Sequence, residues 1–592
     1  MSDAFQVDLR GVVDLLSHHL YSSPRVYLRE MLQNAVDAIT ARREHEPSAP
    51  AEVRIEADGA ALTVADTGIG LRPEQAREFL ATIGRSSKRD DFGFARHEFL
   101  GQFGVGLLSA FLVADEIEVV TKAQGCSPVR WVGRCEGAYS IGPAERDEVG
   151  TTVRLAARPG AQEWFDPRTV RDIVAHFGSM LPCPVTVNGE RVAGDGLPWE
   201  RDGRSTGRRA ADLVGYAQDV LGFTPFDFVE LDVPEAGLTG VAYIMGNTVN
   251  PARPGAHRVY VKRMLLSEEA DGLLPDWAFF VRCVVNAQEL RPTANREALY
   301  EDELLASVRE TLGGRLRSWL IGLSATDPTR LGAFLQAHHL AVKSLAAHDD
   351  EMLRLIGKFW PVQTSHGPKT LAELAQREGT LGYTSRLDEF RQLAQVAAAQ
   401  GMVLINAGYV YDTELVERYP RVDPAFSAQR IGPGDLATQL DELEPELARA
   451  LQPFLTAAGQ VLEPLGCEVV LRSFEPAGIA ALYLLDRADA WQNDVKATKA
   501  QADELWAQLL SVFEKPAPAR PRLVLNIRNP LVEQIVGLTG RPSLLRPVLE
   551  GVYGHALLLG QHPLKDADAA LLNRSLLSLA ELALAQGAAD ER

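Results

Sequence analysis

Apolar side chains recur at helical spacing between residues 24 and 43. Leu28, Leu32, Ala35 and Ile39 follow one another three or four positions apart, so they line one face of a helix. Such a stripe packs against a core in an amphipathic helix. We therefore predict a helix here whose apolar face is buried.

The same segment carries a second row of side chains at helical spacing, and these are polar. Glu30, Asn34 and Asp37 project from successive turns toward a common point on another face. A polar helix face is ordinarily a solvated surface, so this row alone does not indicate a site. Two later glycine-containing segments change that interpretation.

The first of these segments is LTVADTGIGL, residues 62–71. An alternating apolar run ends at Asp66, and Gly68 and Gly70 follow it. The pattern predicts a strand that delivers an acid to its end, then a turn in which no side chain obstructs a ligand. The simpler interpretation is a strand followed by a glycine turn.

The second segment is FLGQFGVGLLSAFLVAD, residues 99–115. Gly101, Gly104 and Gly106 precede a helical pattern of apolar residues at 107–112. Exposed backbone N–H groups at such a helix start suit an anionic phosphate. Glycine-rich loops before helices are common, so this spacing indicates a site only in combination with the others.

Alternating apolar positions predict further strands around these segments. The predicted strands are residues 5–9, 52–57, 61–66, 116–121, 129–136 and 151–155, with another helix at residues 12–21. Strands backed by helices imply a two-layer sandwich, so we expect an α/β (α+β) fold. In that layout a ligand lies between the helices and the sheet.

Taken in order, the three motifs resemble a known nucleotide site. An E-x-x-x-N-x-x-D helix, a D-x-G-x-G turn and a G-x-x-G-x-G loop are similar to those of the ATPase superfamily of gyrase, heat shock protein 90, histidine kinases and MutL. YLREMLQNAVDA and FLGQFGVGLLSAFLVAD most resemble bacterial heat shock protein 90 chaperones, the high-temperature protein G type.

This resemblance implies that the chain binds ATP and Mg²⁺. It assigns Asn34 to the metal ion, Asp66 to adenine and Glu30 to the attacking water as general base. An ionised carboxylate such as Asp66 accepts a hydrogen bond from the adenine amino group and has no hydrogen of its own to donate. The other nucleotide-binding residues implied are Asp37, Gly70, Arg85, Gly101, Gln102, Gly104, Val105, Gly106, Leu107 and Thr151.

Residues 81–99, between the second and third motifs, resemble the lid of this family. The segment is polar and rich in small residues, as a mobile surface segment is. It is shorter than the family's lid, and Arg85 stands where lysine is usual. Leu107 replaces a phenylalanine and Phe79 an asparagine, and these departures bear on lid closure more than on nucleotide binding.

A second informative stretch covers residues 257–305. We predict a strand at residues 258–265, and Asn295, Arg296 and Glu297 match the catalytic loop of the family's middle domain. The resemblance makes Arg296 the arginine that reaches the γ-phosphate, for which a permanently charged planar fork is suited. Tyr300 departs from the glutamine usual there.

The last part of the chain matches the family in outline. Residues 467–474 and 479–485 read as paired strands, and residues 523–535 as a strand with an Asn-Pro turn. Apolar positions from Leu571 to Leu584 predict a final helix. In the family such helices form a four-helix dimer interface, while an intramolecular pair is the simpler interpretation. The ending GAADER lacks the acidic tail that recruits tetratricopeptide co-chaperones.

Length and composition set the limits. The 592 residues suggest several domains, which we place at 1–195 (ATP binding), 196–432 (α/β middle domain) and 433–592 (mainly helical, dimerisation). A net charge of −19 gives no general affinity for nucleic acid. Five scattered cysteines without a CxxC pair indicate reduced thiols in a cytoplasmic protein. We expect no signal peptide and no membrane span.

We therefore expect an ATP-dependent chaperone of the stress response that acts as a homodimer on partly folded clients. Trp277, Phe279 and Phe280, or Trp491, are candidates for client contact, although core positions are the simpler interpretation. Two alternatives stay open: a nucleic-acid ATPase of the gyrase or MutL type, and a nucleotide-regulated scaffold with little hydrolysis. Histidine kinases are disfavoured because no phosphoacceptor helix precedes the first motif.

Overall fold

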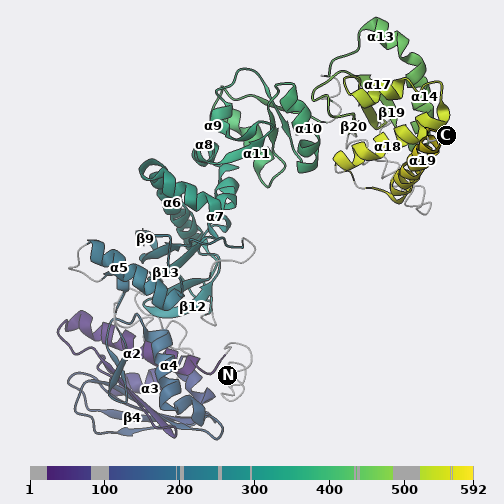
Figure 1. Cartoon of the computed structure of the whole chain (residues 1–592). Coiled ribbons are helices and arrows are strands. Elements are labelled where there is room, and N and C mark those ends of the chain that lie inside the picture. Colours follow the sequence, from purple (N-terminus) through teal and green to yellow (C-terminus); the bar gives the residue numbers. More distant parts are fainter. Residues whose placement is uncertain are drawn as a thin grey trace, which may run out of the picture. The chain divides into compact units, whose positions relative to one another are not determined.

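The structure is a computed structural model in which the chain forms two compact units, residues 1–338 and 339–592 (Figure 1). It describes residues 23–81, 106–194, 196–200, 206–250, 256–293, 297–432, 435, 440–484, 520–560, 562 and 564–590. The two units are described separately. The three-domain division stays a prediction.

The first unit begins with an eight-stranded sheet in the order β5-β4-β3-β6-β2-β1-β7-β8. Neighbouring strands are antiparallel except β1 and β7, which run parallel. The strands are β1 (Val53–Ala57), β2 (Ala61–Asp66), β3 (Ala114–Lys122), β4 (Val129–Arg134), β5 (Tyr139–Pro143), β6 (Gly150–Ala157), β7 (Val185–Val187) and β8 (Glu190–Ala193).

Helices α2 (Val26–His45) and α4 (Pro167–Gly178) pack along one face of this sheet, and α3 (Pro73–Ala81) follows β2 (Figure 1). The predicted stripe of Leu28, Leu32, Ala35 and Ile39 is buried and joins one core with the strands. The predicted α/β sandwich is therefore confirmed, and five of its six predicted strands lie within a few residues of their expected ends. The sixth, at residues 5–9, and the helix at 12–21 lie outside the described residues.

The helical pattern at residues 107–112 forms a short 3₁₀ helix, η2 (Gly106–Leu112), rather than the start of a longer helix. Strand β3 begins at Ala114. The chain therefore has room for only about two turns between the glycine-rich segment and the sheet.

A second sheet in the first unit has the order β12-β11-β13-β10-β9. Its strands are β9 (Asp227–Val233), β10 (Leu238–Ile244), β11 (His257–Val261), β12 (Met264–Ala270) and β13 (Val281–Ala287). The single strand predicted at residues 258–265 is wrong, because β11 and β12 form a hairpin there. Lys262 and Arg263 make the turn with φ of 50° and 68°, without the Asn or Gly that usually marks such a turn.

Three helices accompany this sheet: α5 (Thr206–Tyr216), α6 (Glu303–Thr326) and α7 (Pro328–Ala346). The backbone of α7 leaves helical values at His338, with φ of −130° and ψ of 21°. The His338 ring lies against Phe280 and Phe334, and its Nε2 is 2.8 Å from the carbonyl oxygen of Met245. The kink in α7 thus coincides with a buried anchor in the first unit.

The second unit contains a five-stranded sheet in the order β15-β14-β17-β16-β18. Its strands are β14 (Pro361–Thr364), β15 (Gly367–Thr370), β16 (Leu381–Thr384), β17 (Leu404–Asn406) and β18 (Ala428–Arg430). The helices around it are α8 (Asp350–Phe359), α9 (Leu371–Leu374), α10 (Leu387–Ala399) and α11 (Asp412–Arg418). In this unit, the His339 ring stacks on Trp360 with centroids 4.3 Å apart.

The remainder of the second unit has a three-stranded sheet, β19 (Glu468–Arg472), β20 (Ala481–Leu484) and β21 (Arg522–Asn526). The two strands predicted to pair with each other do not, because β21 lies between β19 and β20. The helices are α13 (Pro445–Ala450), α14 (Gln452–Leu462), α17 (Pro530–Val536), α18 (Pro542–Leu559) and α19 (Asp566–Asp590). The predicted final helix is α19.

Helices α18 and α19 pack closely on each other. A Cβ at Gly554 would lie 2.5 Å from the Leu572 side chain, and the Ser575 hydroxyl donates to the Pro547 carbonyl at 2.7 Å. The pair nevertheless leaves apolar side chains exposed, namely Leu558, Leu559, Leu576, Leu577 and Leu584.

All five cysteines carry free thiols, and three of them are buried. Burial raises the pKa of Cys183 to about 11 and that of Cys467 to about 12. Among the described residues, no helix combines the length and apolar character that crossing a membrane requires.

Candidate nucleotide site

The polar row on α2 differs in exposure from one position to the next. Glu30 and Asp37 are buried, at 2% and 5% exposure, whereas the Asn34 side chain between them is exposed. Arg29 lies beside Glu30, with its Nε 3.8 Å from Glu30 Oε1, and its guanidinium lies over the Phe177 ring of α4. The helix therefore presents one amide to solvent next to two carboxylates held inside the fold.

Asp66 ends β2 as predicted, and its side chain is buried. Its Oδ1 accepts hydrogen bonds from the backbone N–H groups of Gly68 at 2.8 Å and Thr151 at 3.2 Å. Burial raises the pKa of Asp66 to about 6, and the two N–H groups and the charge of Arg146 act in the opposite direction. The carboxyl group is therefore mainly ionised at neutral pH, although little water reaches it.

The turn after Asp66 is fitted tightly to the elements around it. A Cβ at Gly68 would lie 2.5 Å from the Cβ of Ala38 on α2, and one at Gly70, where φ is +66°, would lie 2.1 Å from the Lys122 carbonyl. Ile69 N–H donates to the Ala38 carbonyl at 3.0 Å. Both glycines are thus required for the close approach, and the turn is fixed to α2.

Thr151 lies opposite Asp66 in the pairing of β2 with β6. Its hydroxyl lies 3.0 Å from that of Thr121, which is fully buried on β3 and accepts a hydrogen bond from Leu71 N–H at 2.9 Å. Thr121 therefore joins the strand that carries Thr151 to the turn that carries Gly70. The sequence alone gives no sign of Thr121, and only the strand register, with Thr121 opposite Thr151, identifies it.

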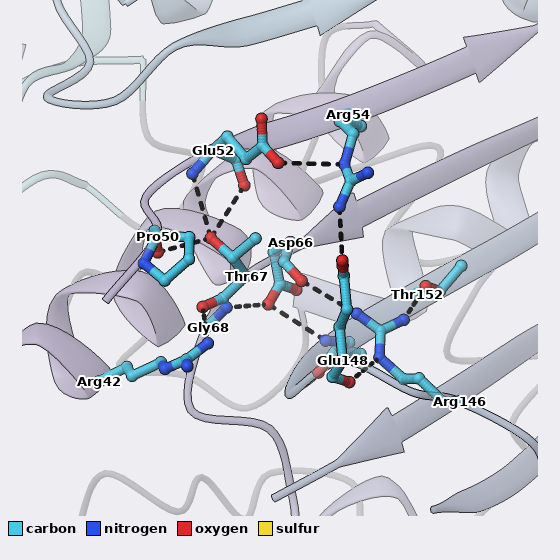
Figure 2. A network of polar contacts seen from close by, with 11 residues as sticks. Arg42, Pro50, Glu52, Arg54, Asp66, Thr67, Gly68, Arg146, Glu148 and Thr152 are labelled. Carbon is cyan, nitrogen blue, oxygen red and sulfur yellow. Dashed lines mark hydrogen bonds and ion pairs between the residues drawn. The ribbon is translucent and has the colours of Figure 1, made fainter. Parts of the chain in front are cut away.

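Arg146, in the loop between β5 and β6, is a second residue that the sequence analysis missed. Figure 2 shows its guanidinium next to Asp66, where Nη2 donates to the Asp66 carbonyl at 3.1 Å. The same guanidinium contacts the Thr152 hydroxyl, and its Nε donates to the Glu148 carbonyl at 2.9 Å. One arginine among many in the sequence gives no signal of this position.

Helix α2 also contacts the turn that follows Asp66. Arg42 Nη1 donates to the Thr67 carbonyl at 3.0 Å, and the Thr67 hydroxyl donates to the Pro50 carbonyl at 2.8 Å (Figure 2). Asp66 is therefore flanked by α2 and by the loop before β6.

Helix α2, which bears Glu30, Asn34 and Asp37, contacts β2, which ends at Asp66 shortly before Gly70 and pairs with β6 at Thr151. Helix α2 also contacts η2, which begins at Gly106 and contains the half-buried Leu107. The remaining predicted residues, namely Arg85, Gly101, Gln102, Gly104, Val105 and Arg296, lie outside the described residues, so their roles stay predictions.

The residues present fit a magnesium ion that is held largely by a nucleotide. Magnesium prefers oxygen ligands and usually keeps one or two protein ligands besides waters and phosphates. The exposed Asn34 amide next to buried carboxylates offers such a ligand. Within the described part of the chain, no three His, Cys, Asp or Glu side chains form a cage that would hold a metal ion by themselves.

Comparison with known proteins identifies the class of this site. Residues 21–132 match the family described as "Histidine kinase-, DNA gyrase B-, and HSP90-like ATPase". Residues 247–376 match the family described as "Hsp90 protein". Residues 21–132 are therefore similar to the ATPase domains of the gyrase, Hsp90 and histidine kinase superfamily. Residues 247–376 and the relatives narrow this similarity to the Hsp90 family.

The relatives are proteins named "Chaperone protein HtpG". The one from Methylobacterium sp. (strain 4-46) is 32% identical over 383 residues, covering 60% of this chain and 62% of the relative. A second, from Methylobacterium nodulans, is 32% identical and is covered over 61% of its length. The one from Chlorobium luteolum is 23% identical over 94% of both chains. The stronger matches thus span about three fifths of their relatives.

Proposed function

We propose that this protein is an ATP-dependent molecular chaperone, a dimeric clamp that couples ATP binding and hydrolysis to the remodelling of client proteins. One observation carries the proposal. The Asp66 carboxylate lies buried at the end of β2, in a turn that is hydrogen-bonded to the helix bearing Glu30 and Asn34. Burying an acid costs stability unless hydrogen bonds or a charge compensate, so a buried acid with a shifted pKa is a candidate binding group, and an adenine amino group is a partner that this position suits. The chaperone names of the relatives support the same function.

In this proposal the first 195 residues form the nucleotide domain. Asp66 accepts a hydrogen bond from adenine, with Gly70 and Thr151 beside it. The glycine-rich segment from Gly101 to Gly106, with Gln102, Val105 and Leu107, holds the phosphates through backbone N–H groups. Asp37 and Arg85 complete the contacts, and residues 81–99 act as the lid.

Hydrolysis requires a base, a cation and a metal ion. Glu30 polarises the attacking water, a task that its position on α2 beside the exposed Asn34 suits. Arg296 from the middle domain, residues 196–432, reaches the γ-phosphate on closure. Asn34 would hold Mg²⁺, and the ion would supply positive charge against the phosphate oxygens. Because Arg296 belongs to another domain, hydrolysis is coupled to a rearrangement.

The proposed partners are partly folded clients and a second copy of the chain. Five leucines of α18 and α19, in residues 433–592, are exposed and suit a helical dimer interface. Phe280 is buried in the core, so it does not offer a client surface, whereas Trp277 is half-buried. Five free thiols suit a reducing cytoplasm, and the family suits a role in the stress response.

Steady-state ATPase assays of the wild type, Glu30→Ala and Arg296→Ala test this proposal, with ATP binding measured by calorimetry. We expect both variants to bind ATP, and turnover to fall about 100-fold or more, because each removes a group that acts in the transition state. Glu116→Ala and Arg134→Ala, which remove an exposed ion pair on β3 and β4, are the matched controls.

Three results would contradict the proposal. A wild-type protein that shows no heat of binding with ATP would remove the nucleotide site altogether. A Glu30→Ala variant with wild-type turnover would remove the assigned base and favour a scaffold. Strong stimulation of turnover by DNA, rather than by an unfolded protein, would favour the gyrase or MutL alternative.

A further inference from the structure

We infer that Arg146 is a positioning residue that keeps the Asp66 carboxylate in its hydrogen-accepting form, and that it thereby sets the preference of the site for adenine. The inference rests on the proposed nucleotide-binding function. It concerns a residue that lies outside the three motifs and that only the folded structure brings to Asp66 (Figure 2).

The first argument is geometric. The guanidinium of Arg146 joins three parts of the sheet edge: the Asp66 carbonyl at 3.1 Å, the Glu148 carbonyl at 2.9 Å and the Thr152 hydroxyl. Asp66 ends β2, while Thr152 belongs to β6, its partner strand. A planar fork with several N–H donors can hold these acceptors at once, which a lysine cannot.

The backbone leaves room for this arrangement at Gly150. A Cβ there would lie 2.2 Å from the Asp66 carbonyl oxygen and 3.0 Å from Arg146 Nη2, and the glycine adopts φ of +134°. A side chain at this position would separate Arg146 from Asp66. Gly150, which begins β6, is therefore required for the contact between Arg146 and Asp66.

The second argument is electrostatic. Burial of the Asp66 carboxyl raises its pKa to about 6, and the positive charge of Arg146 is among the groups that hold this pKa down. The other groups that lower the pKa of Asp66 are the backbone N–H groups of Gly68 and Thr151, and a substitution at Arg146 does not remove them. Removing the charge of Arg146 therefore shifts the pKa of Asp66 further upward.

Two acidic groups on the β1 and β6 side are paired with an arginine. Glu148 and Glu52 both lie against Arg54, at 2.9 and 3.4 Å, and all three side chains are largely exposed (Figure 2). Exposed charges of this kind are screened by solvent. They therefore do not replace Arg146.

On the α2 side, Arg42 pairs with Glu46 at 3.2 Å. Arg43 lies near the Cys183 thiol, whose pKa is raised to about 11 by burial, so that thiol carries no charge at neutral pH. Arg146 is thus the cation that the structure places directly against the Asp66 main chain from the β6 side, within the part of the chain that is described.

Base preference follows from the ionisation of Asp66. A carboxylate accepts a hydrogen bond from the amino group of adenine, whereas a protonated carboxyl group can also donate one and suits the exocyclic carbonyl oxygen of hypoxanthine. A protein that loses the charge of Arg146 should therefore bind adenine nucleotides more weakly at mildly acidic pH. Its preference for adenine over hypoxanthine should fall at the same pH.

The test is calorimetry of ADP and inosine diphosphate binding to full-length wild type, Arg146→Gln and Arg146→Lys between pH 6 and pH 8. An increase of about one unit in the pKa of Asp66 predicts ADP affinity about fivefold weaker at pH 6 and less than twofold weaker at pH 8. Arg146→Lys restores most of the pH profile, because it keeps the charge. Arg130→Gln, which removes an arginine paired with Glu118 on the same sheet, is the matched control.

The outcomes separate the inference from the proposed function. If the wild type binds neither ADP nor ATP, the proposed function fails and the inference with it. If the wild type binds ADP but Arg146→Gln keeps the wild-type pH profile and base preference, the inference alone is overturned. Equal weakening at every pH, with no change in preference, also overturns it, because that result indicates only a structural role.

Discussion

At the scale of single residues, Asp66 shows a conflict between folding and binding. The side chain is buried at the end of β2, and burial raises its pKa to about 6. At neutral pH the folded protein therefore holds a negative charge in a place where desolvation opposes it. The N–H groups of Gly68 and Thr151 offset only part of this cost.

We expect Asp66→Asn to stabilise the unliganded first unit at pH 7 while abolishing nucleotide binding. A pKa raised on folding contributes stability that is present below the unfolded value of 3.8 and is lost as the pH rises through about 6. The neutral amide avoids that loss, a gain of roughly 1–3 kcal/mol at pH 7 that disappears near pH 4. Hydrogen exchange of the backbone amides of β2 and β6 in urea measures this gain in the free energy of unfolding.

Asp58→Asn is the control, and its effect on stability at pH 7 should have the opposite sign. Hydrogen bonds from the N–H groups of Ala61 and Ala60 lower the pKa of this exposed carboxylate, so its stabilisation is present at neutral pH and lost in acid. The neutral amide should therefore destabilise the fold slightly at pH 7. A less stable Asp66→Asn at pH 7 would contradict the account of Asp66.

At the scale of elements, the sequence was most informative where a pattern of apolar residues fits only one kind of secondary structure. The stripe of α2 and the end of β2 at Asp66 were predicted, because helical and alternating periods are local properties. The β11–β12 hairpin was not, because Lys262 and Arg263 adopt left-handed conformations without the residues that usually mark them.

Contacts between distant segments were beyond sequence reasoning for a different reason. The order β19-β21-β20 inserts a later strand between two earlier ones, and periodicity carries no information on strand order. Thr121 and Arg146 reach the candidate site through sheet register and a loop, respectively. The motifs predicted the candidate site, while the contacts that surround Asp66 could be found only in the fold.

A buried ion pair joins α7 to α11 in the second unit. Lys343 Nζ lies 2.6 Å from Asp412 Oδ1, with both side chains at 5% exposure or less, and the ammonium lies over the Trp360 ring. Burial raises the pKa of Asp412, and Lys343 opposes that shift. Each charge therefore depends on the other for its place in the core.

We expect Lys343→Met to destabilise the second unit by about 3 kcal/mol at pH 7, because it leaves Asp412 buried without its cation. The loss should shrink in acid as Asp412 becomes protonated. Lys343→Met combined with Asp412→Leu should recover most of the stability. Urea unfolding of the two variants measures these changes in the free energy of unfolding. Arg386→Met is the control, because Arg386 forms an exposed ion pair with Asp388. Its loss should lower the free energy of unfolding by less than about 1 kcal/mol. A double variant no better than the single one would contradict the account.

At the scale of the whole molecule, the exposed leucines of α18 and α19 bear on assembly. Leu577 is 66% exposed and Leu584 is 75% exposed, although both lie on an apolar helix that packs against α18. Solvent-facing leucines at neighbouring positions are costly in a monomer but suit a helical interface with a second copy.

We expect Leu577→Glu to convert the protein from dimer to monomer in sedimentation analysis, because it places a charge in the proposed interface. ATP binding by the first unit should not change. Leu447→Glu, at an exposed leucine of α13 that is 43% exposed, is the matched control and should stay dimeric. A wild-type protein that sediments as a monomer at micromolar concentration would refute the dimer.

Two adjacent histidines in α7 are each committed to a different unit. His338 lies among Phe280 and Phe334 of the first, while His339 stacks on Trp360 of the second, and the backbone leaves helical values at His338. Each ring is held by its own aromatic cluster, so replacing one histidine removes contacts from one unit and leaves the aromatic contacts of the other in place.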